Sequence, residues 1–230
     1  MIWWNATYLI FALPALALAL FAQWRVKSTY RRYLKEPNGR GISGVDAATS
    51  ILRGQGMGHV SIDGVHGELT DHYDPRSKTL RLSQGVARGR SIASLSIVVH
   101  EIGHAIQDAQ GYFPLRVRSA MVPAVSVSSW VGPILFLLGW FLQSTGLAWA
   151  GVLLFAAGAV FALVTLPVEF NASHRGLQLL ESYQLVDGRE MVGARRVLNA
   201  AALTYIAALA QTLSTLLYYV FMLTGFGRRD

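Results

Sequence analysis

The chain has 230 residues, of which 53% are hydrophobic and 14% charged, and its formal net charge is +7. The hydrophobic share is higher than that of soluble domains, so the composition excludes an ordinary soluble enzyme. The chain contains no cysteine, which excludes disulfides and thiolate metal sites.

Three long stretches carry no charged residue. They cover 1–24, 119–168 and 197–227, with 24, 50 and 31 residues. Because a helix needs about 20 apolar residues to cross a bilayer, they predict one, two and one spans. We therefore expect an α+β membrane protein with four transmembrane helices. The expected transmembrane helices are 1–22, 121–142, 147–168 and 200–224, and the expected cytoplasmic parts are 23–118 and 169–196.

Basic residues follow the first apolar segment at once, from Arg25 to Lys35. A cleavable signal carries its positive charges before the apolar core, so this segment is expected to stay as an anchor. Of the 20 lysines and arginines, 14 lie in 25–118 and four in 175–196, and the positive-inside rule places both parts in the cytoplasm. Four spans agree with this placement; only Arg228 and Arg229 oppose it.

These charges predict a multi-pass protein of the cytoplasmic membrane whose chemistry faces the cytoplasm. The segment from Arg25 to Lys35 is also expected to attract anionic lipid headgroups. Without aromatic stacking motifs, the basic character does not indicate nucleic-acid binding.

The first water-facing part begins with short elements. Ser43 precedes apolar residues at helical spacing and is expected to cap a helix over 44–53. Three short segments, 59–63, 68–73 and 79–83, have strand character, with an Asp-Pro turn between the last two. The simplest arrangement of these strands is a small antiparallel sheet.

A motif for metal chemistry lies on the next element, an amphipathic helix predicted over 91–108. His100 and His104 lie one turn apart on the face opposite the apolar side chains, with Glu101 beside them. Two imidazoles in this arrangement can bind one Zn²⁺ ion, and the carboxylate can act as base on its water. Gly103, in mid-helix, leaves room for the close approach of another element.

A catalytic zinc ion usually has three protein ligands, so one more must come from the same side of the membrane. No His-x-x-Gly-x-x-His extension follows His104, which excludes the metzincin arrangement. Glu169 is the first charge after 50 neutral residues, where a carboxylate without a partner is costly. The other candidates are the carboxylates and His59, His66, His72 and His174.

Several motifs resemble those of known peptidases. The run Glu169-Phe170-Asn171-Ala172-Ser173 resembles the Glu-Phe-x-Ala-Asp element of the HtpX and CAAX prenyl protease families, whose Glu is the third zinc ligand. The stretches 23–28, 69–75, 100–108 and 198–205 look like those of the YugP-type membrane zinc metallopeptidases. This second resemblance covers nearly the whole chain. Ser173 departs from the first pattern, since those families place Asp there, and a serine orients a ligand more weakly.

The resemblance implies a gluzincin-like fold with one catalytic Zn²⁺ ion on His100, His104 and Glu169. Glu101 would accept a proton from water and pass it to the leaving amine. A strand before the active-site helix would form the edge that binds peptide substrate, with 79–83 as one alternative for that edge. The developing oxyanion needs a second donor, for which the candidates are His174, His72 and Tyr73.

The main hypothesis is a membrane-embedded zinc endopeptidase that cleaves membrane or membrane-associated proteins. The alternative is a non-proteolytic membrane module whose zinc stabilises the fold or a partner interface. Glu101 favours the peptidase, because a structural zinc site has no use for a base there. A transporter is less favoured, since the spans carry no interior charge and no evident inverted repeat. The last span carries polar residues that either join helices or line a wet cavity, namely Thr204, Gln211, Thr212, Thr215, Tyr218 and Tyr219.

Overall fold

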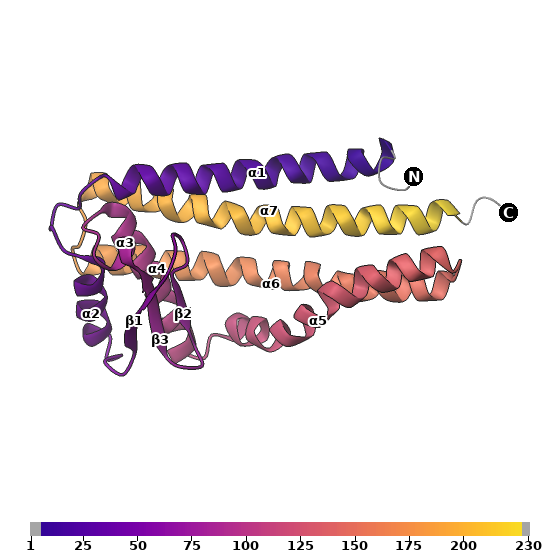
Figure 1. The fold of residues 1–230 in the computed structure, drawn as a ribbon. Helices are drawn as coiled ribbons and strands as arrows, with labels where there is room; N and C mark the ends of the chain where they lie inside the picture. Colours follow the sequence, from indigo (N-terminus) through magenta and orange to yellow (C-terminus); the bar gives the residue numbers. More distant parts are fainter. Residues whose placement is uncertain (1–5, 227–230) are drawn as a thin grey trace. The chain divides into compact units, whose positions relative to one another are not determined.

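The computed structural model describes residues 6–226. This part of the chain is mostly helical, with a small three-stranded sheet (Figure 1). Four of its helices, α1, α5, α6 and α7, are long and apolar enough to cross a membrane. The elements in chain order are α1 (Ala6–Leu34), α2 (Gly44–Gly54), β1 (Ser61–Val65), β2 (His72–Asp74), β3 (Thr79–Ser83), α3 (Gln84–Ala87), α4 (Ile92–Ala109), α5 (Phe113–Phe141), α6 (Thr145–Ser182) and α7 (Gly188–Phe226).

The chain forms two compact units. The apolar unit consists of 6–23, Arg116–Leu166 and 203–226, and therefore holds the apolar parts of the four long helices. The α+β unit consists of Trp24–Leu115 and Pro167–Ala202, and holds the sheet with α2, α3 and α4. It also holds the polar ends of the long helices α1, α6 and α7.

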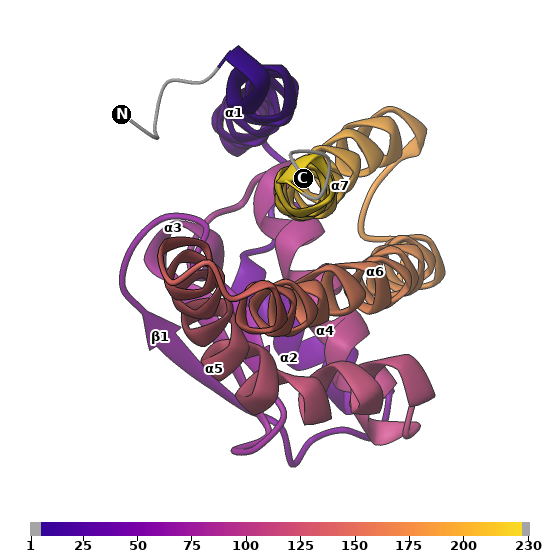
Figure 2. The same cartoon turned by 90° about the vertical axis from the view of Figure 1, so that its right-hand side faces the viewer.

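Glycines allow close helix packing in the apolar unit. A Cβ atom on Gly139 of α5 would lie 2.3 Å from the backbone nitrogen of Ala148 on α6. A Cβ atom on Gly151 would lie 2.4 Å from the nitrogen of Phe136. Small residues of this kind let two backbones approach in a membrane helix pair. Within the same unit α1 lies beside α7 (Figure 2), and the Ser214 hydroxyl of α7 donates to a carbonyl of α1.

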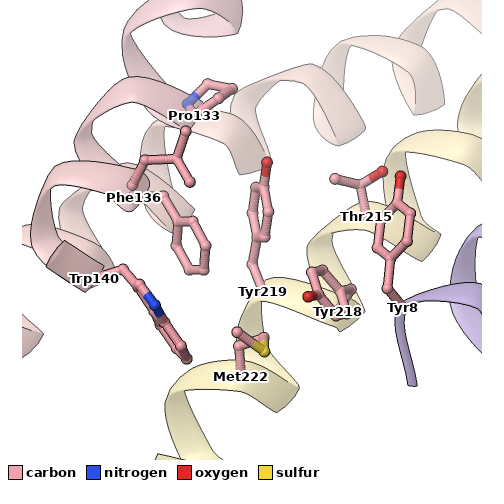
Figure 3. Close-up of a pocket in the computed structure, with 9 residues that line it drawn as sticks. Tyr8, Pro133, Phe136, Trp140, Thr215, Tyr218, Tyr219 and Met222 are labelled. Atoms are coloured by element: carbon pink, nitrogen blue, oxygen red, sulfur yellow. The ribbon is translucent and has the colours of Figure 1, made fainter. Parts of the chain in front are cut away.

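A cavity of about 220 Å³ lies in the apolar unit between α1, α5 and α7 (Figure 3). Its lining is mostly aromatic: the Tyr8 and Tyr218 rings meet edge to face, and the Phe136 and Tyr219 rings stack at 4.0 Å. Thr215, Tyr218 and Tyr219 of the last span all contribute to this lining. Part of the polar face expected on that span therefore faces neighbouring helices.

The sheet of the α+β unit has the strand order β1-β3-β2. β2 pairs with β3 in the antiparallel sense, but β1 pairs with β3 in the parallel sense, so the expected all-antiparallel sheet is wrong. The loop between β1 and β2 contains two residues with positive φ, Gly67 at 103° and Leu69 at 58°. It carries the chain past β3 to the far side. β3 is therefore the central strand, and the alternative that 79–83 forms an edge is also wrong.

Helices α2 and α4 pack with this sheet around one core. Both helices begin at the serine that precedes them: Ser43 accepts from the Asp46 backbone nitrogen, and Ser91 accepts from that of Ser94. Leucines and isoleucines supply the centre, where each buried side chain contributes roughly 1.5–3 kcal/mol. Those with no exposed surface are Ile51, Leu80, Leu82, Leu95, Ile102 and Leu180. The core thereby fixes α4, the element that carries the two predicted histidine ligands.

Candidate metal centre

The candidate site depends on a close crossing of α4 and the second part of α6. A Cβ atom on Gly103 of α4 would lie 2.4 Å from the carbonyl oxygen of Ala172. A Cβ atom on Gly176 of α6 would lie 2.9 Å from the carbonyl oxygen of Val99. Both contacts are closer than any side chain permits, so each helix offers a glycine where the other backbone passes. The expectation that Gly103 leaves room for another element is confirmed.

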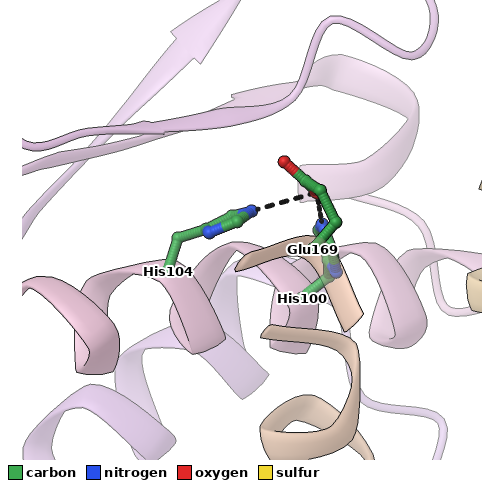
Figure 4. A group of neighbouring side chains, drawn as sticks. All are labelled: His100, His104 and Glu169. Carbon is green, nitrogen blue, oxygen red and sulfur yellow. Dashed lines mark ion pairs between the residues drawn. The ribbon is translucent and has the colours of Figure 1, made fainter. Parts of the chain in front are cut away.

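This crossing brings Glu169 onto the two histidines of α4 (Figure 4). The Glu169 Oε2 atom lies 3.3 Å from His100 Nε2 and 3.5 Å from His104 Nε2. The three possible ligand atoms lie within 4.8 Å of one another. Glu169 is only 2% exposed and His104 9% exposed, so the group is shielded from water.

The donor set fits a zinc ion. Two imidazole nitrogens and one carboxylate oxygen are ligands that zinc commonly takes in catalytic sites. With tetrahedral angles and ligand distances near 2.1 Å, two ligand atoms are separated by about 3.4 Å. The observed nitrogen to oxygen distances of 3.3 and 3.5 Å agree with this value. The positions of His100, His104 and Glu169 would therefore suit a zinc ion.

Hydrogen bonds behind the histidines fix the orientation of both rings. His100 Nδ1 lies 3.1 Å from the Ser173 hydroxyl oxygen, and His104 Nδ1 lies 3.0 Å from Gln107 Oε1. Because the Gln107 oxygen can only accept, His104 carries its proton on Nδ1 and presents Nε2 for a metal. Ser173, which stands where the HtpX and CAAX prenyl protease families place Asp, thus contacts the His100 ring.

Sequence reasoning missed Gln107 and Asn171. The Gln107 side chain is completely buried, and its amide nitrogen donates to the Val168 carbonyl at 2.8 Å and to Asn171 Oδ1 at 3.0 Å. Asn171 also accepts from Arg175 Nε. For Gln107 the available signal was its position three residues after His104, because side chains three residues apart lie on the same helix face and can contact each other. Asn171 lies two residues after Glu169, a spacing that does not place it beside that ligand, so no such signal was present for it.

Glu101 lies beside this group and is 8% exposed. Its Oε2 atom accepts a hydrogen bond of 3.0 Å from the backbone nitrogen of Tyr73, on the edge strand β2. Burial raises the pKa of Glu101, and the neighbouring His100 and His104 oppose that rise. The carboxylate is therefore a stronger base than an exposed glutamate, and an edge strand holds it in place.

The other predicted residues lie apart from the metal ligands. Among the described residues, the group of converging ligands includes no further histidine. The Tyr73 hydroxyl donates to Asp108 at 2.7 Å, and His72 Nδ1 lies 2.8 Å from the Thr70 carbonyl oxygen. The remaining histidine candidates are all exposed, namely His59, His66, His72 and His174.

Replacing Gly103 by alanine should disrupt the metal site, because the new methyl group displaces the α6 backbone that carries Glu169. We expect zinc affinity to fall at least about tenfold, which is the decrease seen when a metal ligand loses its hydrogen-bond partner. Titration with a zinc-selective competitor measures this change. The control is Gly188→Ala, since a Cβ atom there meets nothing within 4 Å. Equal affinities for both variants would contradict the role given to the crossing.

Replacing Glu169 by glutamine should lower zinc affinity sharply, since a neutral amide is a poor substitute for an anionic ligand. The decrease in zinc affinity should exceed the roughly 10- to 100-fold decrease caused by removing a residue that hydrogen-bonds to a metal ligand. Zinc retained after dialysis against a weak chelator gives the readout. Glu181→Gln, an exposed carboxylate on the same helix, should behave as wild type. If Glu169→Gln keeps its zinc, His72 or His174 becomes the next ligand to test.

Comparisons with known proteins agree with this donor set. The sequence pattern of a family described as "Putative neutral zinc metallopeptidase" matches residues 8–224. The chain is 42% identical over 213 residues to "Putative membrane protease YugP" of Bacillus subtilis (strain 168), an alignment that covers 93% of this chain and 95% of that protein. No solved structure matches the chain.

Proposed function

We propose, since this chain belongs to the neutral zinc metallopeptidase family, that it is a membrane-embedded zinc endopeptidase of gluzincin type. Its substrates would be membrane or membrane-associated proteins, cleaved at the cytoplasmic face. The observation that carries the proposal is the position of Glu101. Its carboxylate lies beside the three possible metal ligands but is not one of them, so it is available to act as a base.

The reaction would be hydrolysis of a peptide bond. Zinc, when bound, would polarise the scissile carbonyl group and favour deprotonation of the attacking water. Glu101 would accept the proton of that water on a carboxylate oxygen and later deliver it to the leaving amine nitrogen. The Tyr73 backbone N–H holds the Glu101 side chain through this exchange. Because the side chains of Glu101 and Glu169 are buried, bulk water would have little access to the groups that exchange this proton.

Three residues remain candidates for the second oxyanion donor. His72 donates from Nδ1 to the Thr70 carbonyl, so it can donate from Nε2 only when its ring is charged. Tyr73 must exchange its bond to Asp108 before its hydroxyl can serve. His174 is exposed on α6, five residues after Glu169. Of the three, His72 and Tyr73 lie on the strand that contacts Glu101.

β2 supports the proposed binding of substrate as an added strand. It is an edge strand, and one of its outward backbone N–H groups, that of Tyr73, points to Glu101. An extended peptide that pairs with such an edge would run past the base and the metal ligands. Glu169 directly follows the charge-free stretch 119–168. A membrane helix ending there would place the ligand near the bilayer surface, which favours substrates in or on the membrane.

Glu101→Gln tests the peptidase directly, because it keeps size and packing but removes the base. We expect zinc content and thermal stability to stay at the wild-type level, while casein hydrolysis falls about 10²- to 10⁴-fold. Glu68→Gln, at an exposed loop residue, is the control with the same chemical change.

Two other outcomes of this experiment would change the conclusion. Full activity with zinc retained would remove the peptidase mechanism and favour a structural zinc site. Loss of zinc would instead identify Glu101 as a ligand.

Cysteine labelling tests the cytoplasmic orientation, since the native chain has no cysteine. Ser144 lies between α5 and α6, Ser77 lies between β2 and β3, and both side chains are exposed. A membrane-impermeant thiol reagent should label Ser144→Cys but not Ser77→Cys in intact cells, because lysine and arginine gather around the second site. Both variants should label after permeabilisation. The reverse pattern in intact cells would place the metal site outside.

A further inference from the structure

A groove rich in arginine lies outside the metal site, between the polar ends of α1 and α7. Its volume is about 370 Å³. The lining residues of α1 lie three, four, seven and eight positions after the first of them, so they share one helix face. The lining residues are Arg25, Ser28, Thr29, Arg32 and Tyr33 of α1 and Arg196 of α7. We call it the arginine groove.

Tyr33 gives the arginine groove a fixed geometry. Its side chain is only 4% exposed, and its ring packs against Gly193 of α7, where a Cβ atom would lie 2.8 Å from the ring. The Tyr33 hydroxyl accepts a hydrogen bond of 3.1 Å from Arg196. The Arg32 guanidinium group lies 5.4 Å from the centre of the same ring. A buried aromatic side chain thus positions two of the three cations.

The positive charge of the arginine groove is largely uncompensated. Among the residues that the structure describes, none that lines it is acidic. Within residues 6–226, Arg25 and Arg196 form no ion pair with a carboxylate. Arg32 pairs with Glu36 at 3.1 Å, but both side chains are well exposed, and such surface pairs hold weakly. Three guanidinium groups that converge with little opposing charge attract an anion.

We propose that the arginine groove binds a phosphate group. Guanidinium groups recognise phosphate oxygens through paired, charge-assisted hydrogen bonds. An anionic lipid headgroup and free phosphate offer the same chemistry, and the chain position favours the lipid. Arg25 is the first charge after the apolar part of α1, and Arg196 is the last charge before that of α7. Basic residues at these points of two membrane helices meet the headgroup layer.

Lipid titration of the full-length protein in neutral detergent tests the proposal. Native mass spectrometry counts bound phosphatidylglycerol, with zwitterionic phosphatidylcholine as the comparison. In the double variant Arg25→Gln/Arg196→Gln, the affinity for the first bound phosphatidylglycerol molecule should fall at least about tenfold, since each arginine contributes charge-assisted hydrogen bonds. Arg31→Gln/Arg195→Gln removes the same charge from the same helices at exposed positions outside the arginine groove. This control should bind within about twofold of wild type.

Equal weakening of both double variants would show general attraction to a basic surface and overturn the site. No weakening of either would overturn it as well. If inorganic phosphate displaces the lipid from wild type, the site also takes free phosphate; if it does not, the headgroup is the source. Thermal unfolding in phosphatidylcholine reports whether each variant folds. If the double variant does not fold, the single variants Arg25→Gln and Arg31→Gln are compared instead. Each replaces one exposed arginine, the first inside the arginine groove and the second outside it.

Discussion

The backbone contact between α4 and α6 is the constraint on which the metal site depends. Glu169 and His104 are far apart in the sequence, and only the crossing at Gly103 and Gly176 brings their side chains together. Because α6 continues as one helix from Thr145 to Ser182, the position of Ala172 against Gly103 also sets the positions of Glu169 and Ser173. The ligands therefore converge through helix geometry, with no loop whose motion could separate them.

A buried polar network stabilises the same crossing. Gln107 joins His104 on α4 to the Val168 carbonyl and the Asn171 side chain on α6, and its own side chain has no exposed surface. A fully bonded network of this kind specifies one arrangement, since breaking any member leaves a buried polar group unsatisfied. His100 relies on the single Ser173 hydroxyl instead. The His104 ring is thus held by a more extensive network than the His100 ring.

The sequence predicts the elements that depend on local spacing and misses those that depend on long-range contacts. The α4 helix and the facing pair His100 and His104 follow from periodicity, and the structure confirms them. Glu169 is a candidate because of its place after a charge-free stretch, and the resemblance to known peptidases selects it among the other candidates. The parallel pairing of β1 with β3 does not follow from local spacing, because it depends on a loop that carries the chain past β3. In the sequence, Gln107 and Arg196 look like ordinary polar residues. Their roles depend on contacts with other helices, since Gln107 donates to Val168 on α6 and Arg196 donates to Tyr33 on α1.

Ligand number and charge together favour a catalytic zinc over a structural one. Structural zinc sites are closed by four protein ligands, whereas the group described in residues 6–226 offers three, from His100, His104 and Glu169. A zinc ion held by these three residues would keep a fourth position for water or substrate. Burying Glu101 next to Glu169 is unfavourable for two negative charges, and a divalent cation between the ligands would balance both. A structural ion would need only one of these carboxylates, so the second supports the proposed role of Glu101 as a base.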